Sequence, residues 1–230
     1  MSEIRDVPVL DQAAWAALTG PHARLAEGTG LARRYPTDVS PFAALPPAPD
    51  ERAWADLRAL AGPGGTALLA GDRLVVPAGW TAIAQVDGVQ LVATDAVKTE
   101  PDVELVPLGD DDVPEMLDLV ARTRPGPFLP KTHHLGAYAG VRHDGALIAM
   151  AGERLHPPGY TEISAVCTDP AFRGRGLATR LIRAIAHGIR ERGETPFLHA
   201  SADNVGAIRL YETMGFELRR TVTFNVLRAA

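Results

Sequence analysis

The stretch DPAFRGRGLATRLI, residues 169–182, constrains the fold most, because it joins a predicted strand to a predicted helix through two closely spaced glycines. A loop that only turned the chain would need one glycine, whereas Gly174 and Gly176 leave uncovered backbone N–H groups beside a helix start. Such N–H groups form a binding site for phosphate. We therefore expect an anion-binding loop here; a plain glycine turn before an ordinary helix is the alternative.

The second half of the chain alternates predicted strands and helices. AYAGVRHDGALIAMAGERL predicts two strands joined at Asp144-Gly145. A helix predicted over 175–192 places apolar residues at four-residue steps on one face: Leu177, Leu181, Ile185 and Ile189. Its arginines are expected on the solvated face: Arg180, Arg183, Arg190 and Arg192. The other predicted elements are strands over 103–108, 160–168, 195–201 and 216–227 and helices over 110–123 and 204–214. Together they predict an α/β layer structure.

The first half is rich in chain breakers. YPTDVSPFAALPPAPDERAW carries five prolines between Pro36 and Pro49 and predicts a long surface loop, ahead of a helix from residue 50 to 60. Residues 66–94 alternate β-favouring runs with Gly-Asp, Pro-Ala-Gly and Asp-Gly turns, which is typical of antiparallel strands. The polar segment 95–102 predicts a domain boundary, with an N-terminal α/β domain of unknown role over 1–98 and a second domain over 103–230.

Composition excludes several classes of protein. A net charge of −5 argues against nucleic-acid binding, including by the Arg-Gly-Arg-Gly helix, since phosphate contacts demand basic surface. No apolar run reaches the ~20 residues of a membrane span, and MSEIRDVPVL lacks the pattern of a signal peptide, so a cytoplasmic protein is expected. Cys167 is the only cysteine, which excludes an internal disulfide. No metal is expected, because the adjacent His133 and His134 should point apart on regular structure.

Two motifs in order carry a resemblance to a known family. EISAVCTDPAFRGRGLATRLI followed by ADNVGAIRLYETMGFE resembles the GNAT superfamily of acyl-CoA-dependent N-acyltransferases, and ETPFLHAS is most similar to the glycine N-acyltransferase-like branch. The similarity covers residues 103–228, so 103–230 is expected to be the catalytic domain. The resemblance implies an α+β fold with a mixed, mostly antiparallel sheet flanked by helices. We interpret the smaller domain that precedes the catalytic one, residues 1–98, as a degenerate copy of the same fold.

The resemblance implies acetyl-CoA, or coenzyme A, as cosubstrate and no metal. The pyrophosphate signature matches Arg173, Gly174, Arg175, Gly176, Leu177 and Ala178, and Thr179 adds a hydroxyl one turn into the helix. Backbone at Val166, Cys167 and Thr168 is expected to pair with the pantetheine amides, as an added strand would. Asn204 and Ala207 belong to the second motif, where Asn204 either caps its helix or bonds the pantetheine arm.

Glu162 and Tyr211 are the candidates for acid–base chemistry. Glu162 has apolar neighbours in its strand, so we expect burial, a raised pKa and a general-base role; a carboxylate facing water is the alternative. The resemblance assigns Tyr211 to protonate the departing thiolate, although a core aromatic would show the same pattern. Cys167 is expected to be a small buried hydrophobic residue rather than a nucleophile.

The expected function is N-acetyl transfer from acetyl-CoA to an amine by direct attack, with a non-catalytic acyl-CoA-binding or sensor module as the alternative. The acceptor is expected to be a small-molecule amine or an amino-acid-like compound, bound partly by the loop TRPGPFLPKTHHLG, residues 123–136. Neither nucleic acid nor membrane is an expected partner, and the protein is expected to be a monomer or a homodimer.

Overall fold

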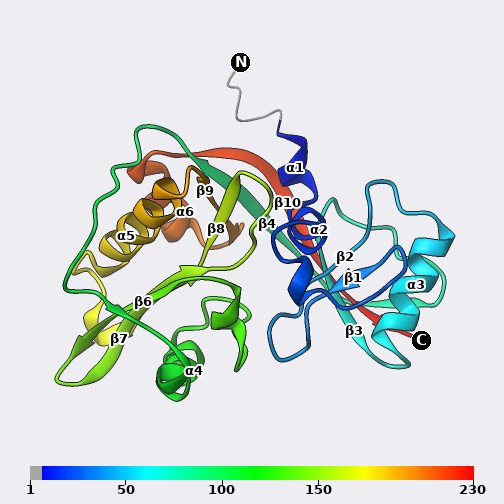
Figure 1. Cartoon of the computed structure of the whole chain (residues 1–230), viewed down its shortest axis with the longest axis horizontal. Coiled ribbons are helices and arrows are strands. Elements are labelled where there is room, and N and C mark those ends of the chain that lie inside the picture. The colour runs from blue at the N-terminus through cyan, green and yellow to red at the C-terminus, as the bar shows by residue number, and fades with distance from the viewer. Residues whose placement is uncertain (1–6) are drawn as a thin grey trace.

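One eight-stranded sheet organises the computed structural model, which describes residues 7–230 (Figure 1). Its strand order is β3-β10-β4-β9-β8-β7-β6-β5, and every neighbouring pair is antiparallel except β8 and β9. The strands are β1 (Arg33–Arg34), β2 (Ala43–Ala44), β3 (Thr66–Gly71), β4 (Trp80–Ala93), β5 (Val106–Pro107), β6 (Tyr138–His143), β7 (Ala146–Glu153), β8 (Tyr160–Thr168), β9 (Thr195–Ser201) and β10 (Phe216–Ala229). The helices are α1 (Pro8–Asp11), α2 (Ala13–Thr19), α3 (Glu51–Ala61), α4 (Val113–Thr123), α5 (Leu177–Glu191) and α6 (Val205–Met214). The mixed, mostly antiparallel sheet flanked by helices is as expected.

Helices α4 and α5 pack on the sheet through different residues of β7. Ala149 and Ala151 join the core under α5, whereas Leu147 and Met150 join the core under α4. Side chains alternate from Ala149 to Ala151, and the register shift opposite Val141 and Arg142 places Leu147 on the same face as Met150. The apolar face predicted for α5 is confirmed, since Leu181, Ile185 and Ile189 are buried and Leu177 packs half-buried beside them.

The turn predicted at Asp87-Gly88 is wrong, because β4 runs straight through it. Gly88 pairs with Ser201 on one side and Val222 on the other. A Cβ at this glycine would lie 2.6 Å from the ring of Phe224 and 2.8 Å from the carbonyl oxygen of Ala200. Gly88 therefore permits close packing instead of a turn.

The boundary predicted between residues 98 and 103 does not interrupt the sheet. β4 lies before it in sequence and takes a central place between β9 and β10, and β10 separates β4 from β3. Figure 1 shows β4 and β10 running side by side from the α5–α6 side of the molecule to the α3 side. The strand order thus gives no support to an independent N-terminal domain. The strand predicted over 103–108 is only Val106–Pro107, at the edge of the sheet.

Arginines of α5 hold the connecting segment between β4 and β5. Arg180 bonds both carboxylate oxygens of Asp102, at 2.7 and 2.9 Å, and Arg190 donates to the carbonyl oxygens of Val97 and Thr94. The expectation of a merely solvated face is therefore wrong for these two residues.

The surface loop predicted ahead of the helix at residue 50 is wrong for its apolar residues. Tyr35 and Phe42 are each 1% exposed, and Leu45 is 5% exposed. Tyr35 and Phe42 pack with α1, α2 and Leu68 of β3. The prolines prevent regular structure, but the apolar residues between them still gain free energy from burial.

Candidate active site

Strands β8 and β9 separate within the sheet and leave a wedge between them. They pair in parallel only from Tyr160↔Thr195 to Glu162↔Phe197, after which β9 stays with β4 and β8 stays with β7. Residues 164–167 of β8 face only Met150–Gly152 of β7, so β8 holds an extra residue there, a β-bulge. Ala165 in this bulge has φ +54°, a left-handed conformation that is rare outside glycine. The strand therefore presents backbone without a β9 partner to the wedge.

The wedge contains a cavity of about 850 Å³. Its walls come from β8, β9, β10 and the loop of residues 123–127, and also from Phe42, Leu68 and Val86 of the first half of the chain. A second cavity of about 430 Å³ lies over the start of α5 and over α6. The two cavities share six lining residues: Val166, Cys167, Thr168, Arg173, Ala207 and Tyr211. A molecule in one cavity therefore meets a molecule in the other at this shared wall.

The second cavity includes the glycine loop. Gly174 and Gly176 both have φ +76°, and a Cβ on either would meet nothing within 4 Å. Gly176 is the N-cap of α5 and no side chain caps the helix, so the first N–H groups of α5 stay available to a ligand. Leu177, Ala178 and Thr179 line this cavity as well. The structure thus brings most of the predicted pyrophosphate residues to one uncapped helix N-terminus.

The two arginines of this loop lie differently. Arg173 lines both cavities, and its Nε donates to the carbonyl oxygen of Thr168 at 3.2 Å. Arg175 lines neither cavity, and its guanidinium carbon lies 4.9 Å from the ring centre of Phe172.

The shared wall carries a buried hydroxyl with no partner among the described residues, Thr168 Oγ1. Buried polar groups are nearly always hydrogen-bonded, so this atom points to a ligand with a polar group at that wall. Cys167 beside it is 6% exposed, and burial raises the pKa of its thiol to about 11. A protonated thiol is a poor nucleophile, in agreement with the expected apolar role.

Helix α6 brings Asn204 and Tyr211 to the same cavities. Asn204 Oδ1 accepts a hydrogen bond from the backbone N–H of Ala207 at 3.2 Å, so the helix-cap prediction is confirmed; Asn204 also lines the larger cavity. Tyr211 is 8% exposed at the shared wall, and burial raises the pKa of its phenol to about 12. Tyr211 therefore carries its proton at neutral pH.

Glu162 is fully buried, but its surroundings differ from those expected. Its carboxylate accepts two hydrogen bonds from Arg154, at 2.9 and 2.5 Å, and one from Nδ1 of His199 at 2.7 Å. Burial alone would raise the pKa of Glu162, yet Arg154 and His199 outweigh it and lower the pKa to about 2. The expected raised pKa is therefore wrong, and the carboxylate does not face water. Glu162 lines neither cavity, whereas Arg154 and His199 both line the larger one.

Gln90 sets the position of the proton on His199. Its Oε1 accepts from Arg219 at 2.8 Å, so its Nε2 must be the atom that donates to Leu10 O and to His199 Nε2, at 2.9 and 3.0 Å. His199 therefore carries its proton on Nδ1, toward Glu162, and the lone pair on its Nε2 accepts the hydrogen bond from Gln90.

The comparisons with known proteins agree with this geometry. A crystal structure attributed to the GNAT family of acetyltransferases, from Novosphingobium aromaticivorans, is 41% identical with a TM-score of 0.89 and covers 96% of this chain and 99% of its own. The chain belongs to the GNAT family. Residues 138–225 also match the family described as FR47-like protein. This GNAT segment contains the wedge, the glycine loop and α6.

Curated relatives match shorter stretches of the GNAT chain. The N-alpha-acetyltransferase RimI of Mycobacterium tuberculosis is 36% identical over 91 residues, which are 38% of this chain and 54% of RimI. A mycothiol acetyltransferase of Mycobacterium marinum is 30% identical over 114 residues, which are 45% of this chain and 36% of that protein. The chain thus spans about half the length of the first of these relatives, and less of the second.

Sequence reasoning missed Arg154, His199 and the wall residues from the first half. The signal for Arg154 is the Glu-Arg pair that ends the apolar run ALIAMAG. His199 stands in TPFLHAS, a strand that is otherwise mostly apolar. Charged residues at such positions need partners when they are buried, which marks both as site candidates.

His133 and His134 do not point apart as expected. They lie in a short 3₁₀ turn, Thr132–Leu135, and the Nε2 atoms of both rings contact Oδ1 of Asp110, at 2.7 and 3.2 Å. Ligand atoms of the three residues lie within 4.8 Å of one another. Asp110 is largely exposed, and none of the three lines the two cavities.

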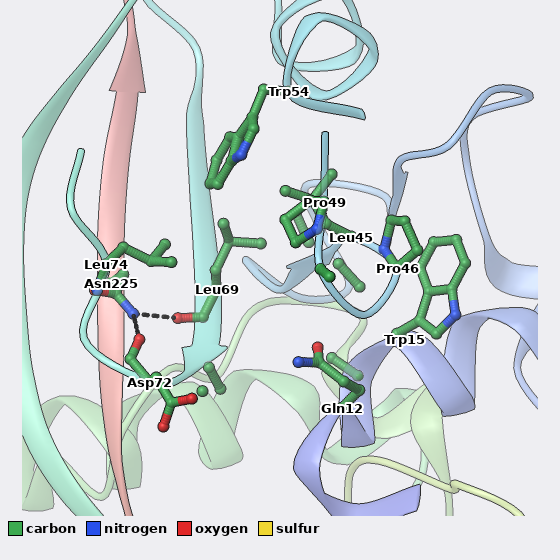
Figure 2. A pocket seen from close by; sticks show the side chains of 16 residues that line it. Gln12, Trp15, Leu45, Pro46, Pro49, Trp54, Leu69, Asp72, Leu74 and Asn225 are labelled. Atoms are coloured by element: carbon green, nitrogen blue, oxygen red, sulfur yellow. Dashed lines mark hydrogen bonds between the residues drawn. The ribbon is translucent and has the colours of Figure 1, made fainter. Parts of the chain in front are cut away.

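A third cavity, of about 220 Å³, shares no residue with the other two. Its lining includes Trp15, Trp54, Pro46 and Pro49 (Figure 2). Asn225 also lines it and donates hydrogen bonds to the backbone oxygens of Leu69 and Asp72.

Within residues 7–230, no helix combines the length and the apolar character that crossing a membrane would require.

Proposed function

We propose that this GNAT protein is an acetyl-CoA-dependent N-acetyltransferase that transfers the acetyl group directly to an amine in the larger cavity. The observation that carries the proposal is the wall shared by the two cavities, where Tyr211 and the free edge of β8 meet. Direct transfer needs thioester and amine side by side, and holding them so supplies much of the rate enhancement.

The residues present fit coenzyme A. The uncapped N-terminus of α5, with Gly174, Gly176 and Arg173, suits a pyrophosphate. The unpaired edge of β8 at Val166–Thr168, with the unpartnered hydroxyl of Thr168, suits the amides of a pantetheine arm. Bound there, the cosubstrate supplies the thioester carbonyl. Arg175 is less suited to this role, because its side chain stacks on Phe172 and lines neither cavity.

The proposed chemistry uses Tyr211 and the Glu162–His199 pair. The amine nitrogen forms a bond to the acetyl carbon while the bond from carbon to sulfur breaks. The amine proton passes to Nε2 of His199 after the hydrogen bond from Gln90 to that atom breaks, and Glu162 stabilises the imidazolium through Nδ1. The phenol of Tyr211 gives its proton to the departing sulfur, and solvent then restores both groups. Glu162 thus acts through His199 instead of touching the amine.

The first 98 residues have a proposed role in this scheme. Phe42, Leu68 and Val86 form part of the acceptor side of the larger cavity. We propose that this segment shapes the acceptor pocket together with the loop of residues 123–127, and that each chain binds one coenzyme A. We also propose a cytoplasmic location, a monomeric or homodimeric state, and membership of the glycine N-acyltransferase-like branch.

A panel of amines with acetyl-CoA, followed by release of free thiol, tests the function. Thiol release that depends on an amine supports the transferase. Binding of one coenzyme A per chain in a calorimeter, without thiol release above a protein-free control for any amine, would instead support the acyl-CoA-binding module.

A further inference from the structure

Arg154 is a buried cation in the larger cavity whose remaining hydrogen-bond donors have no role in the proposed transfer. The residue is 8% exposed, and its guanidinium carbon lies 4.9 Å from the ring centre of Phe42. A buried charge is costly unless it is paired and hydrogen-bonded. Glu162 supplies the pair, but it leaves part of the guanidinium unused.

The unused part of Arg154 faces the cavity. A guanidinium has five N–H donors, and Glu162 accepts from Nε and Nη2 alone. The hydrogen bonds among residues 7–230 include none from Nη1. The side chain keeps 10% of its surface exposed, and it lines the larger cavity. Nη1 and the second N–H of Nη2 are therefore available to a molecule in that cavity.

The rest of the cavity favours an anion that has an apolar group beside it. Its charged lining residues are Arg124, Arg154 and Arg173 against a single carboxylate, Asp203, although the whole chain has a net charge of −5. Apolar side chains line the same cavity: Phe42, on which Arg154 stacks, and Leu68, Phe224 and Val226. These residues and Arg154 line the larger cavity alone, away from the wall at Tyr211.

We propose that Arg154 binds a carboxylate of the acceptor, so that the acceptor is an apolar amino acid whose amine points to the shared wall. The proposal rests on the proposed function, since it names the substrate class of the same cavity. A carboxylate matches the two parallel N–H bonds that a guanidinium presents. A single negative charge also suits a site where Glu162 already lies on the other side of Arg154, because a doubly charged group would be repelled more strongly.

Calorimetry on the wild-type protein with bound coenzyme A tests this without needing a variant. The probes are L-phenylalanine and L-leucine, each against its amide and against the amine that lacks the carboxyl group, 2-phenylethylamine or 3-methylbutylamine. We expect at least one amino acid to bind about 10-fold or more tightly than its amide and its amine, because charge-assisted bonds are lost. Equal affinities within both sets, or binding of none of the probes, would overturn the proposal.

Variants add a second readout. Arg154→Met is expected to remove the preference for the carboxylate, and Arg154→Lys to keep only part of it. Arg142→Met is the matched control and should keep the full preference, because Arg142 is half-buried and also paired with carboxylates, Asp112 and Glu115, but lines neither cavity. If Arg154→Met does not fold, the wild-type comparison still decides. Binding of the amino acid without any acetyl transfer would sink the proposed function and leave this proposal standing. Equal acetylation of amino acid, amide and amine would do the reverse.

Discussion

The Nδ1–H of His199 donates a hydrogen bond to Oε1 of Glu162 over 2.7 Å, and the guanidinium of Arg154 donates two more to the same carboxylate. A carboxylate with a pKa of about 2 is too weak a base to take a proton from an ammonium group efficiently. The same carboxylate is well suited to orient an imidazole and stabilise its charged form. Arg154 and Glu162, which are eight residues apart, therefore act as one unit beside the cavity with His199, which lies 37 residues after Glu162.

Glu162→Gln should lower kcat/KM at neutral pH by roughly 10²-fold, since the amide cannot stabilise the His199 imidazolium. Activity should recover as rising pH deprotonates the amine in solution. His199→Gln should show the same loss, and the double variant should lose little more than either, because members of one unit are not additive. pH–rate profiles of the three variants check this; losses that simply add would separate the two residues.

Tyr211→Phe should lower kcat by removing the proton donor to sulfur, and alkali should not restore it. Its matched control is Tyr138→Phe, because Tyr138 is also buried and its hydroxyl has no partner among the described residues, but it lines neither cavity. Steady-state kinetics of both variants decide. A Tyr211→Phe enzyme with the activity of the control would leave Tyr211 as a packing residue.

Gly176→Glu should abolish coenzyme A binding, since it places a side chain and a negative charge at the N-terminus of α5. Gly193→Glu is a close control at the other end of the helix, because Gly193 has φ +75° and open space where a Cβ would go. Both variants should lose similar stability through backbone strain. Calorimetry with coenzyme A should show normal affinity only for Gly193→Glu; unchanged affinity for Gly176→Glu would refute the loop assignment.

His22 should make the protein less stable in mild acid. Burial, with nearby His156 and Arg24, lowers its pKa from 6.5 to about 4, although Glu153 and the backbone of Leu135 act in the other direction. Because the folded pKa lies below the unfolded value, the full stability is present above pH 6.5 and is lost as the pH falls toward 4. The loss amounts to about 3 kcal/mol.

Denaturant unfolding between pH 7 and 4 measures this loss. His22→Gln should flatten the profile over that range, and His143→Gln, at an exposed histidine, should not. Parallel profiles for wild type and His22→Gln would show that the acid sensitivity arises elsewhere.

The parts of the site that are local in sequence are those that the sequence predicts. The glycine loop, the start of α5 and the cap of α6 at Asn204 each depend on residues within a few positions. The position of Tyr211 in α6 is predicted by the second sequence motif, which is also local.

The parts that were missed depend on long-range pairing. Arg154 meets Glu162 because β7 and β8 lie side by side, and His199 meets it because β9 begins beside β8. The Asp-Gly pair at Gly88 predicts a turn, and only the contact with Phe224 of β10 shows that the glycine is needed for packing. Phe42 reaches the cavity from a proline-rich segment whose composition predicts exposure. No local pattern contains these contacts.

The place of β10 between β3 and β4 also governs the order in which the chain is made and folded. Both strands leave the ribosome well before β10, yet neither can pair with it until residues 216–229 follow. Until then β3 lacks the strand that covers its inner edge, and β4 has an open side. Unpaired strands are sites of aggregation, and such long-range closure is slow. The nascent chain is therefore expected to need protection, by chaperones or by rapid completion of synthesis, over the interval between its first and last sheet strands.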